Sequence, residues 1–246
     1  MADLVGVYAV SHTPVMTNTP DSPSPQNRTD TYAWFEKVGA EIGALDPDAI
    51  VLVSDDHLHN FYLDNLPAFC VGTASKYPSP VEGWLKIEKQ VLPGDHDLGS
   101  HILQYLISDG FDPAVSMELT LDHGMMTPLD LAGLAGAHPV VPILVNAVQP
   151  PMPTMRRCSD LGQALGRAVR AYRDGARIVV LATGGLSHDV GTPRMGELNE
   201  EFDRTFLDLL AAGDRHAAAD YAQREVASAG NGAEEVRNWL IAQAAA

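Results

Sequence analysis

The stretch Leu4-Val5-Gly6-Val7-Tyr8-Ala9-Val10-Ser11-His12-Thr13-Pro14 decides the fold of this chain. Residues 4–10 form a short apolar run rich in β-branched and aromatic side chains, which is typical of a buried strand. Pro14 disfavours helical backbone at Thr13, so the chain turns there. His12 is therefore expected at the carboxyl end of a core strand, where open α/β sheets place their ligand sites.

The same form, a strand followed by small polar residues and a histidine, recurs along the chain. Apolar runs at 49–53 and 176–182 lead to His57 and His188, and a weaker run at 114–119 leads to His123. A further strand is predicted at 140–145, where an internal proline, Pro142, favours an edge strand or a bulge.

Helical patterns separate these strands. Predicted helices cover 32–42, 96–108, 161–172, 199–212, 215–227 and 232–246, and a short one starts near Thr127. Thr29 or Asp30 is the expected cap of the first, and Ser159 or Asp160 of the third. Residues 60–94 give mixed signals, and no element is predicted there. Strands alternating with helices predict an α/β fold: a mostly parallel or mixed central sheet flanked by helices, with residues 1–246 as one catalytic domain.

Composition narrows the class of protein. The chain has 246 residues, 46% of them hydrophobic, and a net charge of −16, which argues against nucleic acid and anionic membrane surfaces as partners. No apolar run approaches the roughly 20 residues of a membrane span, and no secretory signal is evident, so a cytoplasmic protein is expected. Cys70 and Cys158 do not form a metal-binding spacing and are expected to be small buried side chains.

The histidines after the strands are candidates for a metal site. The chain has nine histidines, and His12, His57, His123 and His188 each follow a predicted strand. Strand ends of one sheet converge, so these side chains are expected to meet. Two histidines and one carboxylate on one face of an ion leave positions open for substrate and O2, as in non-haem Fe(II) oxygenases. His12 and His57 form the candidate ligand pair.

The last helix offers the third ligand. Asn231 suits its N-cap, and Glu234 then suits the reciprocal cap position. Glu235 shares a helix face with Trp239, and an inward carboxylate beside a tryptophan is costly unless it is paired or bound to metal. Glu235 is therefore the candidate ligand. His59 is a rival, since two residues after His57 in an extended segment it would share that residue's face.

Five motifs occur in a characteristic order. They are Ser11-His12-Thr13-Pro14, Asp56-His57, Leu121-Asp122-His123-Gly124, Gly184-Gly185-Leu186-Ser187-His188 and Glu235-Val236-Arg237-Asn238-Trp239. Together they span nearly the whole chain, which resembles the class III extradiol ring-cleavage dioxygenases. The resemblance implies that His12, His57 and Glu235 hold Fe(II) and that His123 and His188 are the acid–base pair.

The resemblance also implies a reaction and partners. A catechol-type ring is expected to be cleaved beside its two hydroxyls, with both atoms of O2 inserted. A homo-oligomer is expected, and some relatives add a small helical subunit over the site, which the sequence leaves open here. Also open are a 2-aminophenol substrate, a zinc-dependent hydrolase at the same triad, and a non-enzymatic binding relative. Candidate anchors for a substrate carboxylate are Arg194, Lys76, Lys86 and Thr127.

Overall fold

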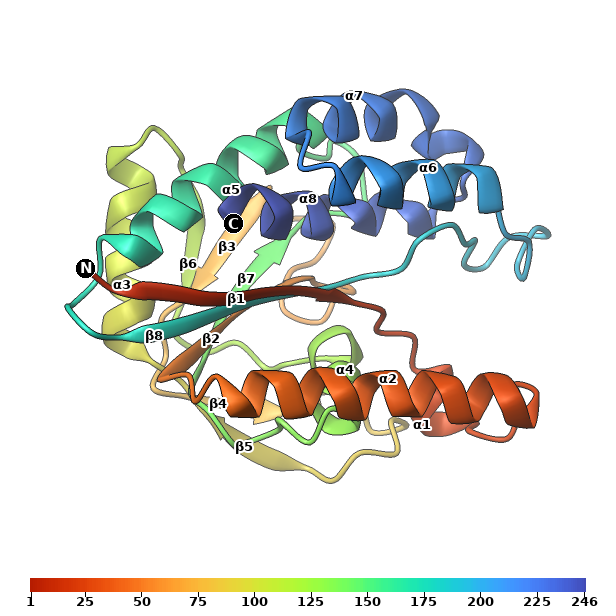
Figure 1. The fold of residues 1–246 in the computed structure, drawn as a ribbon, viewed down its shortest axis with the longest axis horizontal. Helices are drawn as coiled ribbons and strands as arrows, with labels where there is room; N and C mark the ends of the chain where they lie inside the picture. Colours follow the sequence, from red (N-terminus) through yellow and green to blue (C-terminus); the bar gives the residue numbers. More distant parts are fainter.

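The computed structural model describes residues 1–246 and is built around one six-stranded sheet (Figure 1). The strands are β1 (Asp3–Val10), β2 (Ala49–Asp55), β3 (Phe69–Gly72), β6 (Ala114–Ser116), β7 (Val140–Val145) and β8 (Arg177–Thr183). Their order across the sheet is β1-β8-β2-β7-β3-β6, and of these pairs only β3–β7 is antiparallel. The predicted α/β fold with a mostly parallel sheet is confirmed.

Helices connect most of the strands. They are α1 (Val15–Asn18), α2 (Pro25–Ala44), α3 (His96–Ser108), α4 (His123–Leu131), α5 (Met155–Arg170), α6 (Glu200–Ala211), α7 (Arg215–Glu225) and α8 (Val236–Ala245), with 3₁₀ turns η1 (Val226–Ser228) and η2 (Gly232–Glu235). None of these helices combines the length and apolar character that crossing a bilayer requires.

A separate hairpin lies in the region for which no element was predicted. Strands β4 (Lys76–Ser79) and β5 (Gln90–Pro93) pair antiparallel, apart from the main sheet. Both strands of a two-stranded ribbon are edges, so each tolerates the prolines that made the sequence there look irregular.

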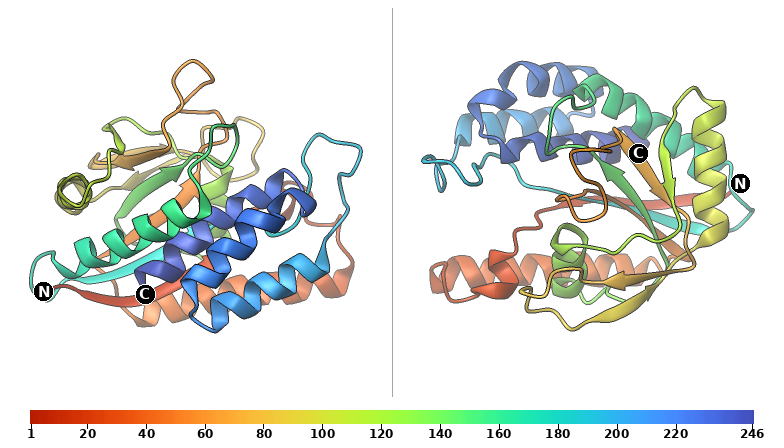
Figure 2. Two further views of the ribbon diagram at one scale, coloured as in Figure 1. Left: turned by 90° about the horizontal axis from the view of Figure 1, so that it is seen from above. Right: turned by 180° about the vertical axis from the view of Figure 1, so that it is seen from behind.

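The helices lie on both faces of the sheet (Figures 1 and 2). On one face, α3, α5 and α8 bury side chains such as Ile102 and Leu165 against the strands. On the other face, α2, α4 and the β4–β5 hairpin bury Leu92 and Leu129. Helices α6 and α7 form an outer layer over α8, around Phe206. Each such buried side chain stabilises the fold by roughly 1.5–3 kcal/mol.

A close contact between α5 and α8 fixes the position of the last helix. A Cβ atom on Gly162 would lie 2.3 Å from the carbonyl oxygen of Ile241, and one on Gly166 would lie 2.4 Å from that of Ala245. The two backbones therefore touch, and any side chain at these glycines would push α8 away. This contact matters for the site because the turn that leads into α8 carries Glu235.

Three helices begin earlier than predicted, and one of them is α4, which starts at His123 with Asp122 as its cap and not near Thr127. Helix α2 begins at Pro25, and the Oγ of Ser24 accepts a hydrogen bond from the backbone of Asn27. Helix α5 begins at Met155, with Thr154 as its cap. The predicted caps Thr29, Asp30, Ser159 and Asp160 are therefore wrong. The first turn of α2 is polar, so Ser24 and the first-turn proline mark its start better than the apolar period does. In α5, Arg156 and Arg157 interrupt the apolar period, and Thr154 marks the start.

Strand β7 is internal to the sheet, so the edge position inferred from Pro142 is wrong. Pro142 is in register with Leu52 of β2. Its other neighbour, β3, pairs only with residues 143–145 of β7, so the proline removes no hydrogen bond from that ladder. Gly72 also leaves room for the proline ring, because a Cβ atom there would lie 3.0 Å from Pro142 Cδ.

Candidate active site

Three neighbouring parallel strands end at one edge of the sheet. Strands β1, β8 and β2 lie side by side, so the residues that follow them meet at their carboxyl ends. His12 follows β1, His57 follows β2, and the loop to His188 follows β8. The backbone N–H of Gly184 donates to the carbonyl of Val10 at 3.0 Å, which keeps the first and third of these segments together.

Glu235 lies between the two candidate histidine ligands. Its Oε2 is 3.1 Å from Nε2 of His12, and its Oε1 is 3.8 Å from Nε2 of His57. The backbone N–H of Gly185 also donates to Oε2. His12 and Glu235 are buried, and the side chain of His57 is 21% exposed. The three predicted metal ligands therefore converge, although they lie far apart in the sequence.

Asp55 is a fourth donor that the sequence reasoning missed. Its Oδ2 lies 3.1 Å from Nε2 of His57, is buried, and has no hydrogen-bond partner. One donor atom each from His12, Asp55, His57 and Glu235 lies within 4.8 Å of the others. A buried carboxylate oxygen without a hydrogen bond is costly, and a positive charge beside it, on a protonated His57 or on a metal ion, would compensate it. The sequence feature that indicates Asp55 as a donor is its place as an acidic residue at the last position of a core strand, two residues before His57.

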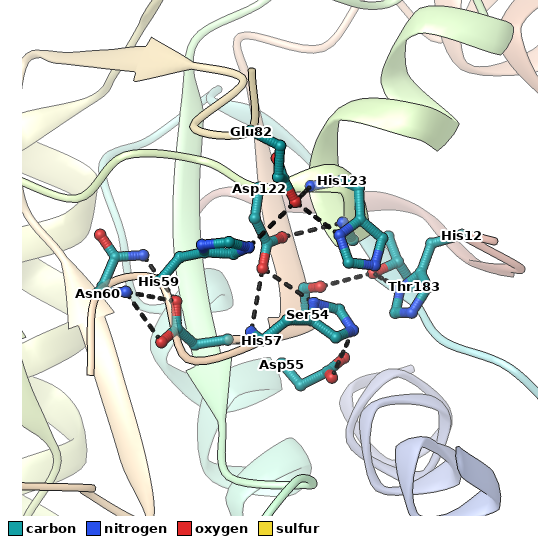
Figure 3. A network of polar contacts seen from close by, with 12 residues as sticks. His12, Ser54, Asp55, His57, His59, Asn60, Glu82, Asp122, His123 and Thr183 are labelled. Carbon is teal, nitrogen blue, oxygen red and sulfur yellow. Dashed lines mark hydrogen bonds and ion pairs between the residues drawn. The ribbon is translucent and has the colours of Figure 1, made fainter. Parts of the chain in front are cut away.

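Hydrogen bonds orient both candidate ligand histidines (Figure 3). The hydroxyl of Thr183 donates to Ser54 at 2.8 Å, so at 3.2 Å it accepts from Nδ1 of His12. Asp122 accepts from Nδ1 of His57 at 2.9 Å and from its backbone N–H at 3.1 Å. Nδ1 of each ring is therefore a donor, and Nε2 faces Glu235, as metal-bound histidines are held by outer partners.

The two candidate acid–base histidines are oriented in the same way. Nδ1 of His123 donates to Oε1 of Glu82 at 2.6 Å, and its ring centroid lies 4.1 Å from that of His57. Nδ1 of His188 lies 2.9 Å from the carbonyl of Leu186, which only accepts. Nε2 of His188 is 3.9 Å from Oε1 of Glu235. In both rings Nε2 is therefore the nitrogen left to exchange a proton.

Opposite charges balance each other in the site. Burial raises the pKa of Glu235, but His12 and His57 more than offset it and hold that pKa well below its usual range. Burial lowers the pKa of His57, yet Asp55 and Asp122 raise it well above the usual value. Burial also lowers the pKa of His12, and Glu235 reverses the shift. Carboxylates therefore favour positive charge here, the condition that a divalent cation would satisfy.

A cavity of about 720 Å³ opens beside these groups. It is lined by Ser11, His12, Thr13, Pro14, His57, His59, His123, Gly185, Leu186, Ser187, His188, Val190, Met195 and Glu235. His59, the rival ligand, lines it too, but its Nε2 lies 3.3 Å from Glu82. The structure therefore groups His59 with Glu82 and His123, and not with Glu235.

The candidate anchors for a substrate carboxylate do not line this cavity. Arg194 lies 3.5 Å from Asp189 and 3.2 Å from Glu197. Lys86 donates to the carbonyl of Asn18 at 2.7 Å. Lys76 lies on the β4–β5 hairpin and Thr127 is buried within α4.

The start of the last helix differs from the prediction, although Glu235 faces inward as predicted. Asn231 caps no helix, and its Oδ1 instead accepts from the backbone of Val190 at 2.8 Å. Glu234 forms an ion pair with Arg237. The predicted capping pair is wrong because the 3₁₀ turn η2 precedes α8, which starts only at Val236.

Neither cysteine belongs to the site. Cys70 and Cys158 are free and buried, and burial raises the pKa of each thiol to about 12. Both thiols therefore stay protonated, as expected of small buried side chains.

Known proteins resemble this chain over nearly its whole length. Two relatives named 2,3-dihydroxyphenylpropionate/2,3-dihydroxicinnamic acid 1,2-dioxygenase are similar to it. The one from Azotobacter vinelandii is 28% identical, covering 98% of this chain and 89% of the relative. The one from Mycolicibacterium vanbaalenii is 31% identical, covering 98% and 88%.

A solved structure supports the fold. The crystal structure of an uncharacterized protein from Escherichia coli K12 superposes with a TM-score of 0.59 at 17% identity, covering 87% of this chain and 81% of that one. The sequence model of the family described as "Catalytic LigB subunit of aromatic ring-opening dioxygenase" matches residues 6–246. The chain therefore belongs to the LigB family of aromatic ring-opening dioxygenases.

Proposed function

We propose that this protein is a non-haem Fe(II)-dependent extradiol dioxygenase that cleaves the ring of a catechol-type substrate with O2. The observation that carries the proposal is the convergence of His12, His57 and Glu235 beside a cavity of about 720 Å³. The substrate in the names of the two relatives contains a catechol ring, which supports this substrate class. Both oxygen atoms of O2 enter the product as the ring bond beside the hydroxyl-bearing carbons breaks.

His12, His57 and Glu235 would hold the iron. Two imidazole nitrogens and a carboxylate are the donor set of non-haem Fe(II) oxygenases. The unpartnered, buried Oδ2 of Asp55 beside His57 supports a cation at this point. When bound, Fe(II) supplies open positions for catechol and O2 and a route for electrons between them.

His188 is the proposed general base. Its Nδ1–H donates to the carbonyl of Leu186, so Nε2 carries a lone pair, and the side chain lines the cavity. Nε2 takes the proton of a catechol hydroxyl as the substrate binds. The side chain is 33% exposed, so this proton can pass on to water.

His123 is the proposed proton donor. It lines the cavity, its side chain is only 12% exposed, and its Nδ1 is held by Glu82. For this role Nε2 first takes up a proton released by the catechol, which makes the ring an imidazolium whose Nδ1–H stays bonded to Glu82. During ring opening Nε2 gives that proton to the departing oxygen and the ring returns to the neutral Nδ1–H form.

Metal exchange and a substrate panel test the function. The protein is stripped with a chelator, loaded anaerobically with Fe(II), and given catechols with different substituents and 2-aminophenol. We expect one O2 consumed per substrate and a yellow ring-opened product from at least one catechol. Chelated and Zn(II)-loaded protein should consume no O2, because zinc has no redox chemistry.

Three outcomes would contradict the proposal. Turnover of the Zn(II) form without O2 would favour a hydrolase, and cleavage of 2-aminophenol alone would change the substrate class. Failure of the Fe(II) protein to consume O2 with any compound would favour a binding protein.

A glycine beside His188 gives a second test. A Cβ atom on Gly232 would lie 2.0 Å from Nε2 of His188, so Gly232→Ala must displace the ring. We expect kcat to fall roughly 10²-fold with the iron content unchanged, since a misplacement of about 1 Å has that effect. Gly43→Ala is the matched control, because nothing lies within 4 Å of a Cβ atom there. Unchanged kcat in Gly232→Ala would contradict the role of His188.

A further inference from the structure

The segment before Glu82 is fixed beside the segment that carries His123. The backbone N–H of Val81 donates to the carbonyl of Leu121 at 2.8 Å, and that of Leu121 donates to Pro78 at 3.1 Å. These backbone bonds set Glu82 next to His123 although 41 positions separate them. Glu82 lies in the loop between β4 and β5, outside the proposed ligands and the proposed acid–base pair.

Glu82 makes two hydrogen bonds to His123 through a single oxygen (Figure 3). Its Oε1 accepts from Nδ1 of the ring at 2.6 Å and from the backbone N–H at 2.9 Å. The Glu82 side chain is fully buried. Burial raises the pKa of this carboxyl, but the two bonds from His123 more than offset it and lower the pKa below its usual range. The carboxylate is therefore an acceptor only, and the proton between the two groups resides on Nδ1.

These bonds restrict the ring of His123. Ring and backbone of the same residue are tied to one oxygen atom, which sets the side-chain rotation as well as the tautomer. The ring is also flanked by His57, with centroids 4.1 Å apart, and by Trp84 at 5.8 Å. Nε2 is left as the nitrogen free to act in the cavity that His123 lines.

The other oxygen of Glu82 argues against a purely structural role. Oε2 is buried and has no hydrogen-bond partner, a condition that costs roughly 1–3 kcal/mol or more for a charged group. A carboxylate kept only for stability would be expected to have both oxygens satisfied. A buried polar atom without a partner is a local cost of the kind that proteins retain at functional sites.

We infer that Glu82 is a positioning residue that holds His123 in the Nδ1–H tautomer with Nε2 presented to the cavity, an inference that rests on the proposed function. Glu82 itself does not touch the substrate. It acts through His123, so its removal should affect turnover and leave iron and substrate binding in place.

Steady-state kinetics of the Fe(II)-loaded enzyme test this role. Glu82→Ala should lower kcat by roughly 10–100-fold, the usual effect of losing an orienting partner, with KM and iron content within about threefold of the parent. Glu82→Gln should recover most of kcat, because its amide oxygen still accepts both bonds. Glu88→Gln, at an exposed position six residues further along, is the matched control. A change in KM with unchanged kcat would overturn the inference.

A double-mutant cycle separates this role from a general loss of stability. In a His123→Ala background, Glu82→Ala should reduce kcat by less than about twofold, because the residue through which it acts is gone. If the two substitutions instead lower kcat independently, so that their effects multiply in the double variant, the inference is overturned. If Glu82→Ala does not fold, Glu82→Asp replaces it. The aspartate keeps the negative charge, but its side chain is shorter by one methylene, so the carboxylate lies farther from the His123 ring.

The histidine tautomer gives a readout that needs no activity. In full-length metal-free protein with ¹⁵N-labelled imidazoles, His123 should be in the Nδ1–H form in the parent and in Glu82→Gln, and a mixture in Glu82→Ala. An unchanged tautomer in Glu82→Ala overturns the positioning role whatever the activity. A changed tautomer in a protein that cleaves no catechol would instead leave the positioning intact and refute the proposed function.

Discussion

Glu235→Gln is expected to abolish iron binding and ring cleavage together. The substitution keeps the size of the side chain and removes its charge, which lies 3.1 Å from His12 Nε2. Loss of an orienting partner lowers metal affinity roughly 10–100-fold, and loss of a ligand charge should exceed that. Iron supplies several kcal/mol to such reactions, so we expect kcat to fall by roughly 10³-fold or more. Iron per chain after gel filtration and O2 uptake measure the two effects.

The neighbouring acid is the matched control. Glu234 is 19% exposed and forms an ion pair with Arg237, away from the proposed ligands. Glu234→Gln should keep its iron and its kcat, although the lost charge beside a buried arginine should lower the melting temperature. Loss of iron in Glu234→Gln with retention in Glu235→Gln would reverse the assignment of the two acids.

The convergence of the strand ends could be predicted from the sequence because it depends on local signals. A buried apolar run and a following proline or glycine pair place His12 and His188 at strand ends without knowledge of the strand order. Parallel strands then bring their ends to one edge whatever their sequence in the sheet. The confirmed α/β fold follows from the same signals.

The partners that orient the histidines could not be predicted, because tertiary contacts alone select them. Glu82 lies in a segment without apolar periodicity and reaches His123 through backbone bonds to Leu121. Asp55 and Asp56 are adjacent acids after the predicted strand at 49–53, and the sequence alone does not show which of the two carboxylates faces His57. Asp56 instead accepts from the backbone of Asn60, so it holds the loop and does not enter the site.

The last helix shows a correct face predicted together with a wrong cap. Glu235 and Trp239 lie on the inner side as the four-residue spacing predicted, and Trp239 donates to the carbonyl of Gly184 at 3.2 Å. The capping pattern failed because Asn231 bonds to Val190 of the loop after β8. The four-residue spacing still places Glu235 and Trp239 on one face when the first turn is a 3₁₀ turn. A capping bond, in contrast, requires the backbone geometry of an α-helical first turn.

His188→Ala is expected to slow ring cleavage without removing the iron. The substitution deletes the proposed base while leaving His12, His57 and Glu235 in place, and Nε2 of His188 is 3.9 Å from the nearest Glu235 oxygen. Loss of a general base lowers kcat by roughly 10²–10⁴-fold. Anaerobic titration with a catechol should still show substrate bound to the Fe(II) protein, and single-turnover absorbance should show the slower chemical step.

A distant histidine separates this effect from a general response to losing an imidazole. His138 makes no hydrogen bond and lies outside the cavity, so His138→Ala should keep both iron and kcat. His188→Phe should be as slow as His188→Ala, because a ring of similar size without a nitrogen cannot accept a proton. If either His188 variant lost its iron, or if phenylalanine restored kcat, the imidazole would be a ligand or a wall of the cavity, and the proton would have to pass through another group.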